Sequence, residues 1–400
     1  MDFKMDSRQD RLRAEVRTFA RDNLPRLDQF VAPSSASVAA VGREQMRMWT
    51  GILSAKGWSV PRWPIEWGGP GWSGDLAAIL DDALAEAGAP MTDPIGIGFV
   101  GPVLYTFGTQ RQKDKYLPGI RNGEVLWCQG FSESAAGSDI QSIRTMAVKV
   151  NDTYLVNGQK QWISNAHNAN MMCALVKVQS PGNRRQQGLS FLLIDMRTDG
   201  VSVAPTISLD GRHWINEVSL ENVVVPEENL VGEQGQGWIY ARFLLSKERA
   251  VVAGLPMLRR MLLELQTMVA ERQGSHGTTG ALGDPLRRTT LRLQIELAAL
   301  EFLEYRLMEI GDRSEADLLA PVLKLRACEW RQKISEAMFD LIGESGLRYS
   351  ASRDVTLKYR QEPTQMNAIV ANYLFQRSAT IAGGTSEIQR NIIASLALGS

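Results

Sequence analysis

The sequence predicts an α+β protein whose regions run helical, then antiparallel β, then helical again. Apolar residues recur with a helical period up to about Gly123 and again beyond Gly237. Between these points the period changes to two, as expected for strands with one buried face. At about 150 residues per domain, the 400 residues correspond to two or three domains. We therefore expect domains at 1–124, 125–236 and 237–400.

The first region contains several helix signals and punctuating glycines. Thr109-x-x-Gln112 has the spacing of a capping box, in which each side chain bonds the other residue's backbone. Further helical patterns are Leu12, Val16 and Phe19 after Ser7, and Leu76, Ile79, Leu80 and Leu84 after Asp75, with Gly57, Gly88 and Gly123 at helix ends. Gly96-x-Gly98-x-x-Gly101 matches a dinucleotide-binding pattern, but it lies inside the helical region and follows no strand. We interpret that match as chance.

The middle region has the alternation and turn residues of an antiparallel sheet. Met146, Val148 and Val150 alternate with other positions, and Asn157-Gly158 predicts a tight hairpin turn. Short strand-like runs cover residues 171–178, 189–196 and 201–206.

The last region returns to the helical period. A long apolar stretch runs from Trp238 to Val269, and a glycine-rich break from Gly274 to Pro285 separates it from further helices.

Composition narrows the class of function. The 44 Lys and Arg residues balance 44 Asp and Glu residues, so no positive field favours nucleic acid or an anionic membrane. No apolar run reaches the roughly 18 residues of a membrane span, and the N-terminus lacks an export signal. Three cysteines and three scattered histidines supply neither a disulfide framework nor a metal cluster. We expect a cytoplasmic protein without a metal site.

Three segments carry candidate ligand-binding chemistry. Residues 127–139 combine small residues with the hydroxyls of Ser132 and Ser138, while Trp162 places an aromatic face two residues before a hydroxyl. Gly383-Gly384-Thr385 opens a terminal helix, with Ser386 and Gln389 at capping-box spacing, and a helix N-terminus attracts anions. Each segment alone also fits an ordinary polar loop, a packed tryptophan or a capped helix.

Together the segments resemble the acyl-CoA dehydrogenase family, whose flavoproteins desaturate an acyl-CoA thioester between Cα and Cβ. The stretches that carry the resemblance are FSESAAGSD at 131–139, YLVNGQKQWISNA at 154–166, NEVSLENVVVPEENLVGEQGQGW at 216–238 and GGTSEIQRNIIA at 383–394. The resemblance implies an N-terminal helical domain, a middle antiparallel β-barrel-like domain and a C-terminal four-helix bundle. It also implies FAD as the cofactor.

Carried over by position, the family's motifs assign roles to individual residues. The resemblance places the cofactor-binding positions at Gln129, Phe131, Ser132, Gly137, Ser138, Trp162, Ile163, Ser164, Thr385 and Glu387. Ser164 would bond near flavin N5, and Ser132 and Ser164 stand where many members have Thr. The substrate-binding positions are Ser138, Arg249, Gly383 and Gly384.

The catalytic base departs from the commonest family pattern. Many members carry it as Glu in the register occupied here by Gly383, and glycine cannot accept a proton. Another branch carries Glu before an Arg on the first long C-terminal helix, which corresponds to Glu248 and Arg249. In a helix Glu248 shares a face with Leu244, Val251, Val252 and Leu255, and apolar surroundings raise a carboxylate pKa toward that of a useful base. The alternative is a structural charge group with Lys247 or Arg249.

The assembly motifs also differ from those of the family's homotetramers. An Arg-x-x-Phe-Gly segment is missing at 272–285, and a Gln-x-x-Gly-Gly-x-Gly element is altered at 340–346. The chain is similar in this respect to paired-subunit dehydrogenases for dicarboxylyl-CoA or steroid side-chain thioesters. The resemblance therefore implies a homo-oligomer or a heterotetramer with a second such subunit, an acyl-CoA substrate and an electron-transfer flavoprotein as electron acceptor.

Three functions stay open. The favoured one is FAD-dependent desaturation of an acyl-CoA with Glu248 as base, in fatty acid or steroid side-chain degradation. A second is a non-catalytic subunit that completes a partner's flavin pocket. A third keeps the fold but acts as an oxidase or a flavin-dependent eliminating enzyme. The small Ala382 and Gly383 suit a branched, dicarboxylic or polycyclic acyl group.

Overall fold

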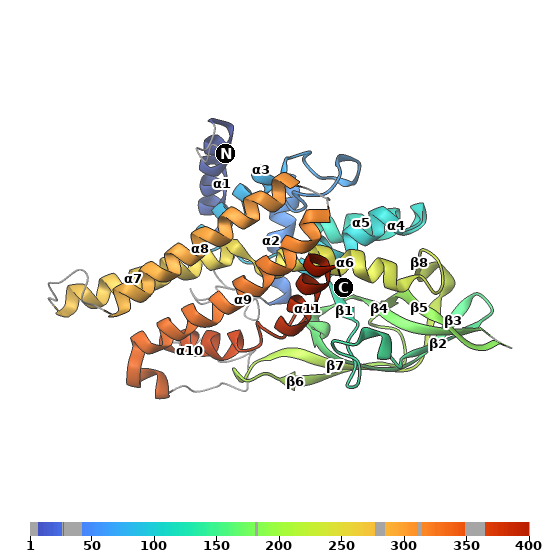
Figure 1. The fold of residues 1–400 in the computed structure, drawn as a ribbon. Coiled ribbons are helices and arrows are strands. Elements are labelled where there is room, and N and C mark those ends of the chain that lie inside the picture. Colours follow the sequence, from blue (N-terminus) through green and yellow to red (C-terminus); the bar gives the residue numbers. More distant parts are fainter. Residues whose placement is uncertain are drawn as a thin grey trace.

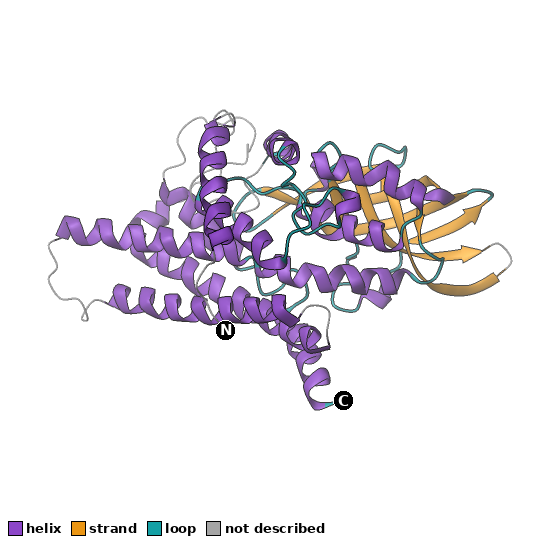
Figure 2. Ribbon diagram, turned by 90° about the horizontal axis from the view of Figure 1, so that it is seen from above, coloured by secondary structure: helices purple, strands orange, loops and turns teal. Residues whose placement is uncertain are grey.

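The computed structural model describes residues 7–25, 27, 42–180, 183–276, 285–310, 314–348 and 365–399. The described helices before the sheet are α1 (Ser7–Asn23), α2 (Arg43–Ala55), α3 (Gly74–Glu86), α4 (Gly101–Phe107) and α5 (Gln110–Asn122). Those after it are α6 (Gly237–Ala253), α7 (Leu255–His276), α8 (Pro285–Ile310), α9 (Ser314–Ile342), α10 (Gln365–Gln376) and α11 (Ser386–Leu398). The strands lie at one end of the molecule with α4, α5 and α6 beside them, and the long helices α7 to α10 extend toward the other end (Figures 1 and 2). The α+β class and the predicted order of regions are confirmed.

The N-terminal helices begin and end where the sequence predicts. Thr109 accepts a hydrogen bond from Gln112 N at 3.2 Å, and the Gln112 side chain accepts one from Thr109 N at 3.0 Å, so the capping box is confirmed. The glycine pattern that begins at Gly96 forms a short π-helix, Gly96–Val100, within the helical region. A Cβ on Gly101 would lie 2.1 Å from the Trp63 ring, so this glycine makes room for an indole and not for a dinucleotide.

The described strands form one mixed sheet in the order β6-β7-β3-β2-β4-β5-β8, with β1 also paired to β4. Their bounds are β1 (Trp127–Gly130), β2 (Met146–Val150), β3 (Thr153–Ser164), β4 (Met171–Ser180), β5 (Asn183–Asp195), β6 (Val201–Ile207), β7 (His213–Pro226) and β8 (Leu230–Val231). Pairings β1–β4 and β2–β4 are parallel, and the other described pairings are antiparallel.

Both faces of the central strand β4 are buried, because its alternate residues pack in different cores. Cys173 and Leu175 of β4 pack with the N-terminal helices and α6, whereas Met172 and Ala174 pack with β3 and β7. Asp93 links the helices to the sheet, since its carboxylate accepts from Ile95 N and from Trp127 N, both at 3.0 Å. Burial raises the pKa of Asp93 to about 6, against the opposing effect of these backbone bonds.

The predicted hairpin turn at Asn157-Gly158 is wrong. Strand β3 continues through both residues, with a register shift against β7 between Val156 and Gly158, and the turn between β2 and β3 is formed by Asn151 and Asp152, with Asn151 at φ 52°. Gly158 serves a close approach, because a Cβ there would lie 2.4 Å from Thr145 Oγ1. The glycine of this Asn-Gly pair is therefore explained by packing against Thr145 inside a strand, and not by a turn.

The predicted apolar stretch from Trp238 to Val269 forms two helices, so the expectation that Leu255 shares a helix face with Glu248 is wrong. Gly254 adopts φ 59° between α6 and α7, so Leu255 belongs to a different helix from Leu244. Leu244 packs in the core shared by the sheet and the N-terminal helices, whereas Leu255 packs in a bundle core built mainly from α7, α8, α9 and α10. The four-helix bundle is confirmed.

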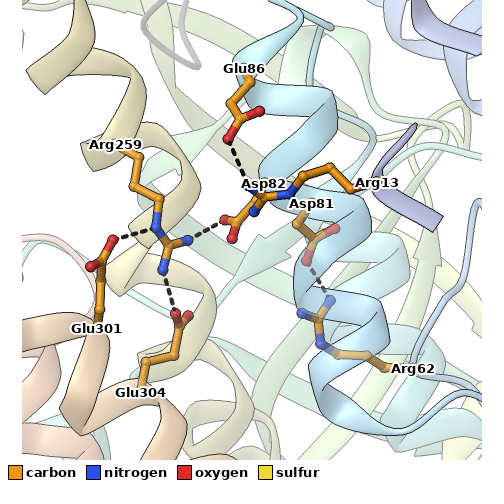
Figure 3. A network of polar contacts seen from close by, with 8 residues as sticks. All are labelled: Arg13, Arg62, Asp81, Asp82, Glu86, Arg259, Glu301 and Glu304. Atoms are coloured by element: carbon orange, nitrogen blue, oxygen red, sulfur yellow. Dashed lines mark hydrogen bonds and ion pairs between the residues drawn. The ribbon is translucent and has the colours of Figure 1, made fainter. Parts of the chain in front are cut away.

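A network of charged residues joins the N-terminal helices to the bundle (Figure 3). Arg259 of α7 pairs with Asp82 of α3, with Glu301 at 2.6 Å and with Glu304 at 3.3 Å, both on α8. One cation therefore faces three carboxylates. Burial raises the pKa of Asp82 to about 7, although Arg259 opposes that rise.

The three cysteines, Cys128, Cys173 and Cys328, are all free and fully buried. Burial raises the pKa of the Cys128 thiol well above its ordinary value. Among the described helices, none is long and apolar enough to cross a membrane.

Candidate functional site

Trp162 combines a left-handed backbone with a large exposed side chain. Its φ is 63° and its side chain is 58% exposed. The register between β3 and β7 shifts between Lys160 and Ile163, so Trp162 lies in a β-bulge. Such a backbone costs a bulky residue about 1–3 kcal/mol and persists only where the surroundings enforce it. The bulge therefore displays an uncovered aromatic face, which suits a planar ligand.

The loop after β1 is tied directly to this bulge. Gln161 N donates a hydrogen bond of 2.9 Å to the carbonyl oxygen of Ser132. Within the loop, Glu133 and Ala136 exchange backbone hydrogen bonds of 3.0 and 3.1 Å, which makes a small turn with Ser134 and Ala135 at its tip. Two segments that the sequence suggested separately, 129–138 and 162–164, thus meet at one edge of the sheet.

A buried ion pair fixes the loop against β3. The Lys160 ammonium is fully buried and donates to Glu133 Oε1 at 2.8 Å, to Leu175 O at 2.7 Å and to Phe131 O at 3.3 Å. Burial lowers the pKa of Lys160 to about 8, with Glu133 opposing the fall. The pKa of Glu133 is lowered because its bonds to Lys160 and Thr145 outweigh its burial.

The loop and the bulge carry serine hydroxyls that are available for hydrogen bonding, and they leave room for a ligand beside them. Among the described residues, the side-chain hydroxyls of Ser132 and Ser164, both half-buried, have no hydrogen-bond partner. Ser138 is exposed, and a Cβ on Gly137 would meet nothing within 4 Å. The surface thus offers donors, room for close backbone approach and the exposed Trp162 ring. This donor set fits a planar heterocycle that stacks and accepts hydrogen bonds.

Other predicted site residues face the protein interior. The Phe131 side chain is 3% exposed and packs edge-on against Phe191, and the Ile163 side chain is 1% exposed in the sheet core. Their side chains therefore do not face a ligand, and the Phe131 carbonyl already accepts from Lys160 and the Ile163 carbonyl from Asn216 Nδ2. Gln129 lies half-buried in β1.

The third predicted segment lies on the bundle. Its described hydrogen bonds are made within 380–390 and with α9, where buried Lys324 donates to the Gly384 carbonyl. Gly383 and Gly384 have φ of 66° and 85°. The N-cap of α11 is Thr385, which accepts from Ile388 N at 3.2 Å, so the predicted capping box from Ser386 to Gln389 is wrong by one residue.

Glu387 is exposed in the first turn of α11. Its own backbone N–H is the main reason why the pKa of its carboxylate is lowered. Its ionised side chain is thus stabilised at the positive end of the helix.

Glu248 and Arg249 lie within the span of α6, but their side chains fall outside the described part of the chain, as do those of Lys247, Val251 and Val252. Helix α6 starts beside the sheet, because Ser190 Oγ accepts from Gly235 N at 2.9 Å just before the helix. Among the described residues, no group of three or more His, Cys, Asp and Glu is arranged to hold a metal.

The sequence reasoning missed the residues that hold the site together: Lys160, Glu133 and Asn216. A signal for two of them was present. Side chains at alternate positions of a strand share one face. Lys160 lies on the inward face of β3 with Val156 and Gly158, and Asn216 lies on the inward face of β7 with Val218 and Leu220. A polar residue at an inward position of a strand requires a buried partner.

The chain matches family models along most of its length. The models are the acyl-CoA dehydrogenase N-terminal domain at residues 6–124, the middle domain at 128–223 and the C-terminal domain at 235–398. It is 34% identical over 395 residues to acyl-CoA dehydrogenase IpdE1 of Mycobacterium tuberculosis, covering 97% of this chain and 96% of that protein.

Two solved structures share the fold over the whole chain. The Tcur3481-Tcur3483 steroid ACAD has a TM-score of 0.83 and 27% identity, covering 100% of this chain and 99% of the other. The ChsE4-ChsE5 complex from Mycobacterium tuberculosis has a TM-score of 0.79 and 25% identity, with coverage of 100% and 99%.

Proposed function

Because the chain belongs to the acyl-CoA dehydrogenase family, whose members are FAD-dependent oxidoreductases, we propose that it desaturates the acyl group of a CoA thioester between Cα and Cβ. The observation that carries this proposal is the exposed, strained Trp162 beside open serine hydroxyls. When bound, FAD supplies the hydride acceptor.

In this proposal the β-bulge and the loop after β1 hold the cofactor. Trp162 stacks against its planar ring system, Ser132 and Ser164 donate hydrogen bonds, and the backbones of Gln129, Phe131 and Ile163 line the approach. Gly137 and Ser138 leave room at the loop's open side. Thr385 and Glu387, at the start of α11, form a third contact, and the assembled protein is expected to bring that contact to the cofactor.

Glu248 is proposed as the base that removes the α-proton of the thioester. Support comes from its place on α6, whose earlier turns carry Ala241 and Leu244 into the core beneath the sheet. Ser138, Gly383, Gly384 and Arg249 are proposed to contact the substrate, with Arg249 orienting Glu248 or the adjacent backbone. Apolar surroundings hold water away from the acyl group, which strengthens each of these polar contacts.

We propose a bulky, branched, dicarboxylic or polycyclic acyl group. Ala382 and Gly383 take little space beside the expected site, and one structural relative is described as a steroid ACAD. Degradation of steroid side chains is therefore a more specific proposal than degradation of straight-chain fatty acids.

A heterotetramer with a second acyl-CoA dehydrogenase-like subunit is the proposed assembly. Both solved relatives are named as pairs of different chains. The missing family elements at 272–285 and 340–346 point the same way, although residues 277–284 lie outside the described part of the chain. An electron-transfer flavoprotein is the proposed electron acceptor. The three buried thiols support a reducing compartment, the cytoplasm.

The domain limits at 1–124, 125–236 and 237–400 remain our proposal. Support comes from Gly123, which ends α5 at φ 79°, and from Gly237, which begins α6.

The decisive experiment is anaerobic bleaching of the purified protein, alone and with its partner subunit, by a panel of CoA thioesters. We expect a yellow protein that loses its visible absorbance with a bulky acyl-CoA, and a Glu248→Gln variant that binds flavin but bleaches at least a thousandfold more slowly. Ser246→Ala, a change two residues away on the same helix, is the control and should bleach normally.

The result also separates the alternatives. A chain that never binds flavin in any assembly is a non-catalytic subunit. Bleaching by Glu248→Gln at the normal rate reassigns the base. Rapid oxygen consumption, or a product without a new double bond, favours an oxidase or an eliminating enzyme.

A further inference from the structure

A buried amide lies directly behind the bulge that carries Trp162. Asn216 of β7 is fully buried and lies opposite Ile163 of β3. Its side-chain Nδ2 donates to Ile163 O at 3.0 Å and approaches Trp214 O at 3.4 Å. Asn165 N in turn donates to Trp214 O at 2.9 Å. The backbone immediately after Trp162 is thus held by one side chain as well as by the strand pairing.

Two histidines fix the orientation of that amide. Asn216 Oδ1 lies 3.2 Å from His167 Nδ1 and 2.7 Å from His213 Nε2. The two rings are tilted by 30° to each other, with centroids 4.1 Å apart. Because the carbonyls of Ile163 and Trp214 only accept hydrogen bonds, the NH₂ group must face them and the oxygen must face the rings. Both ring nitrogens that touch Asn216 must therefore carry a proton.

The remaining nitrogen of His167 must be unprotonated. Asn168 Nδ2 lies 3.0 Å from His167 Nε2 and 2.6 Å from Asn165 Oδ1. The side-chain oxygen Oδ1 of Asn165 only accepts hydrogen bonds. The Asn168 side-chain nitrogen therefore donates one hydrogen to Asn165 Oδ1 and the other to His167 Nε2. His167 is therefore neutral. Burial, followed by the nearby His213, lowers its pKa, which agrees with this assignment.

Charged side chains also lie on the described elements next to the two histidines. On α2, Arg43 donates to Asn168 O at 2.9 Å, and in the turn before β7, Asp210 and Arg212 lie 3.6 Å apart. Strand β6, which also contacts the His167 segment, carries no ionisable side chain. The carboxylate of Asp210 is paired with Arg212, and a proton added to His167 Nε2 would remove the hydrogen bond that Asn168 donates there.

We propose that Asn216 is a positioning residue for the flavin-facing segment from Trp162 to Ser164, and that hydrogen bonds from His167 Nδ1 and His213 Nε2 hold its amide in the orientation that bonds Ile163. This inference rests on the proposed function, because that function assigns a flavin to the segment. The histidines act through Asn216, and Asn216 acts through the backbone of the bulge.

The first test needs no flavin. Hydrogen–deuterium exchange of the flavin-free full chain reports the amides of Gln161 and Asn165, which lie on either side of the bulge. We expect Asn216→Ala to speed their exchange about tenfold, as expected for the loss of one buried hydrogen bond. Asn157→Ala is the matched control, because Asn157 Oδ1 accepts from Asn222 N at 2.8 Å at the far end of the same strand pair.

The second test uses substitutions that keep one nitrogen donor at the position of the histidine N–H. His213→Gln retains an N–H near the Nε2 position, and His167→Asn retains one near the Nδ1 position. Both variants should preserve slow exchange, whereas His213→Ala should speed it. In the flavin-loaded protein, Asn216→Ala should weaken FAD binding about tenfold and shift the visible flavin spectrum. Should Asn216→Ala fail to fold, the comparison of His213→Ala with His213→Gln decides the question.

The outcomes are distinct. Unchanged exchange at Gln161 and Asn165 in both Asn216→Ala and His213→Ala overturns the inference, whether or not flavin binds. Faster exchange together with weaker FAD binding supports it. Faster exchange in a protein that binds no flavin supports the role of Asn216 in holding the bulge and overturns the proposed function. Unchanged FAD affinity and spectrum in Asn216→Ala overturn the flavin-positioning role.

Discussion

Two buried charge centres hold this molecule together in different ways. In the middle domain, Lys160 faces a single carboxylate, Glu133, and backbone groups satisfy the other polar atoms around the pair. Between the N-terminal helices and the bundle, Arg259 faces three carboxylates, and the pKa of Asp82 rises to about 7. In the matched pair, one cation compensates one carboxylate. An excess of carboxylates makes a joint that strengthens when protons are added.

The largest expected effect is the loss of the matched pair. Lys160→Met leaves Glu133 buried without its cation, which typically costs 3–5 kcal/mol, roughly, of the free energy of unfolding. We expect urea denaturation to show this loss and the loop from 129 to 138 to become accessible to protease. The double variant Lys160→Met/Glu133→Gln should recover part of the loss. A single variant as stable as the wild type would show that the pair does not hold the loop.

The next effect concerns the three-carboxylate centre. Arg259→Leu should lower the free energy of unfolding by about 2 kcal/mol at pH 8, less than Lys160→Met, because protonation of Asp82 relieves part of the repulsion. The deficit should shrink at pH 6. Arg197→Ala, which removes an exposed ion pair with Asp195, is the control and should leave the denaturation midpoint unchanged. An equal deficit at both pH values would contradict a role for carboxylate titration.

The smallest expected effect is a change in how steeply the denaturation midpoint depends on pH. The folded-state pKa of Asp82 is raised to about 7, above its ordinary value of 3.8, so the folded chain binds more protons than the unfolded chain between these values. This contribution to stability is therefore present at low pH and is lost as pH rises toward 7. Asp82→Asn should flatten the dependence of the denaturation midpoint between pH 5 and pH 8. Parallel curves for variant and wild type would place the titration elsewhere.

The parts of the fold that could be predicted are those determined by patterns of residues close together in the sequence. Leu12 and Val16 at helical spacing, the capping pair Thr109 and Gln112, and the alternation along β2 each specify one short segment. Asn157-Gly158 misled because a glycine required by a contact with Thr145 has the same appearance as a turn glycine. Gly254, which ends α6, was passed over because apolar residues continue on both sides of it.

The candidate site was predictable in its exposed residues but not in its supports. Trp162, Ser132 and Ser164 follow from the motifs that resemble the family. Lys160 was not recognised, because its role depends on Glu133, which lies 27 residues away in the sequence and contacts it only in the folded sheet. Asn216 depends in the same way on His167, 49 residues away. Long-range pairs of this kind leave a signal only where a polar side chain occupies an inward strand position.

The burial of all three native thiols makes the protein suitable for site-specific labelling. A maleimide must reach the sulfur atom to react, so the buried Cys128, Cys173 and Cys328 should resist maleimides. A Ser134→Cys change at the exposed tip of the turn after β1 would then offer a single attachment point. A fluorophore attached there would report arrival of the cofactor in real time, without any background from the rest of the chain.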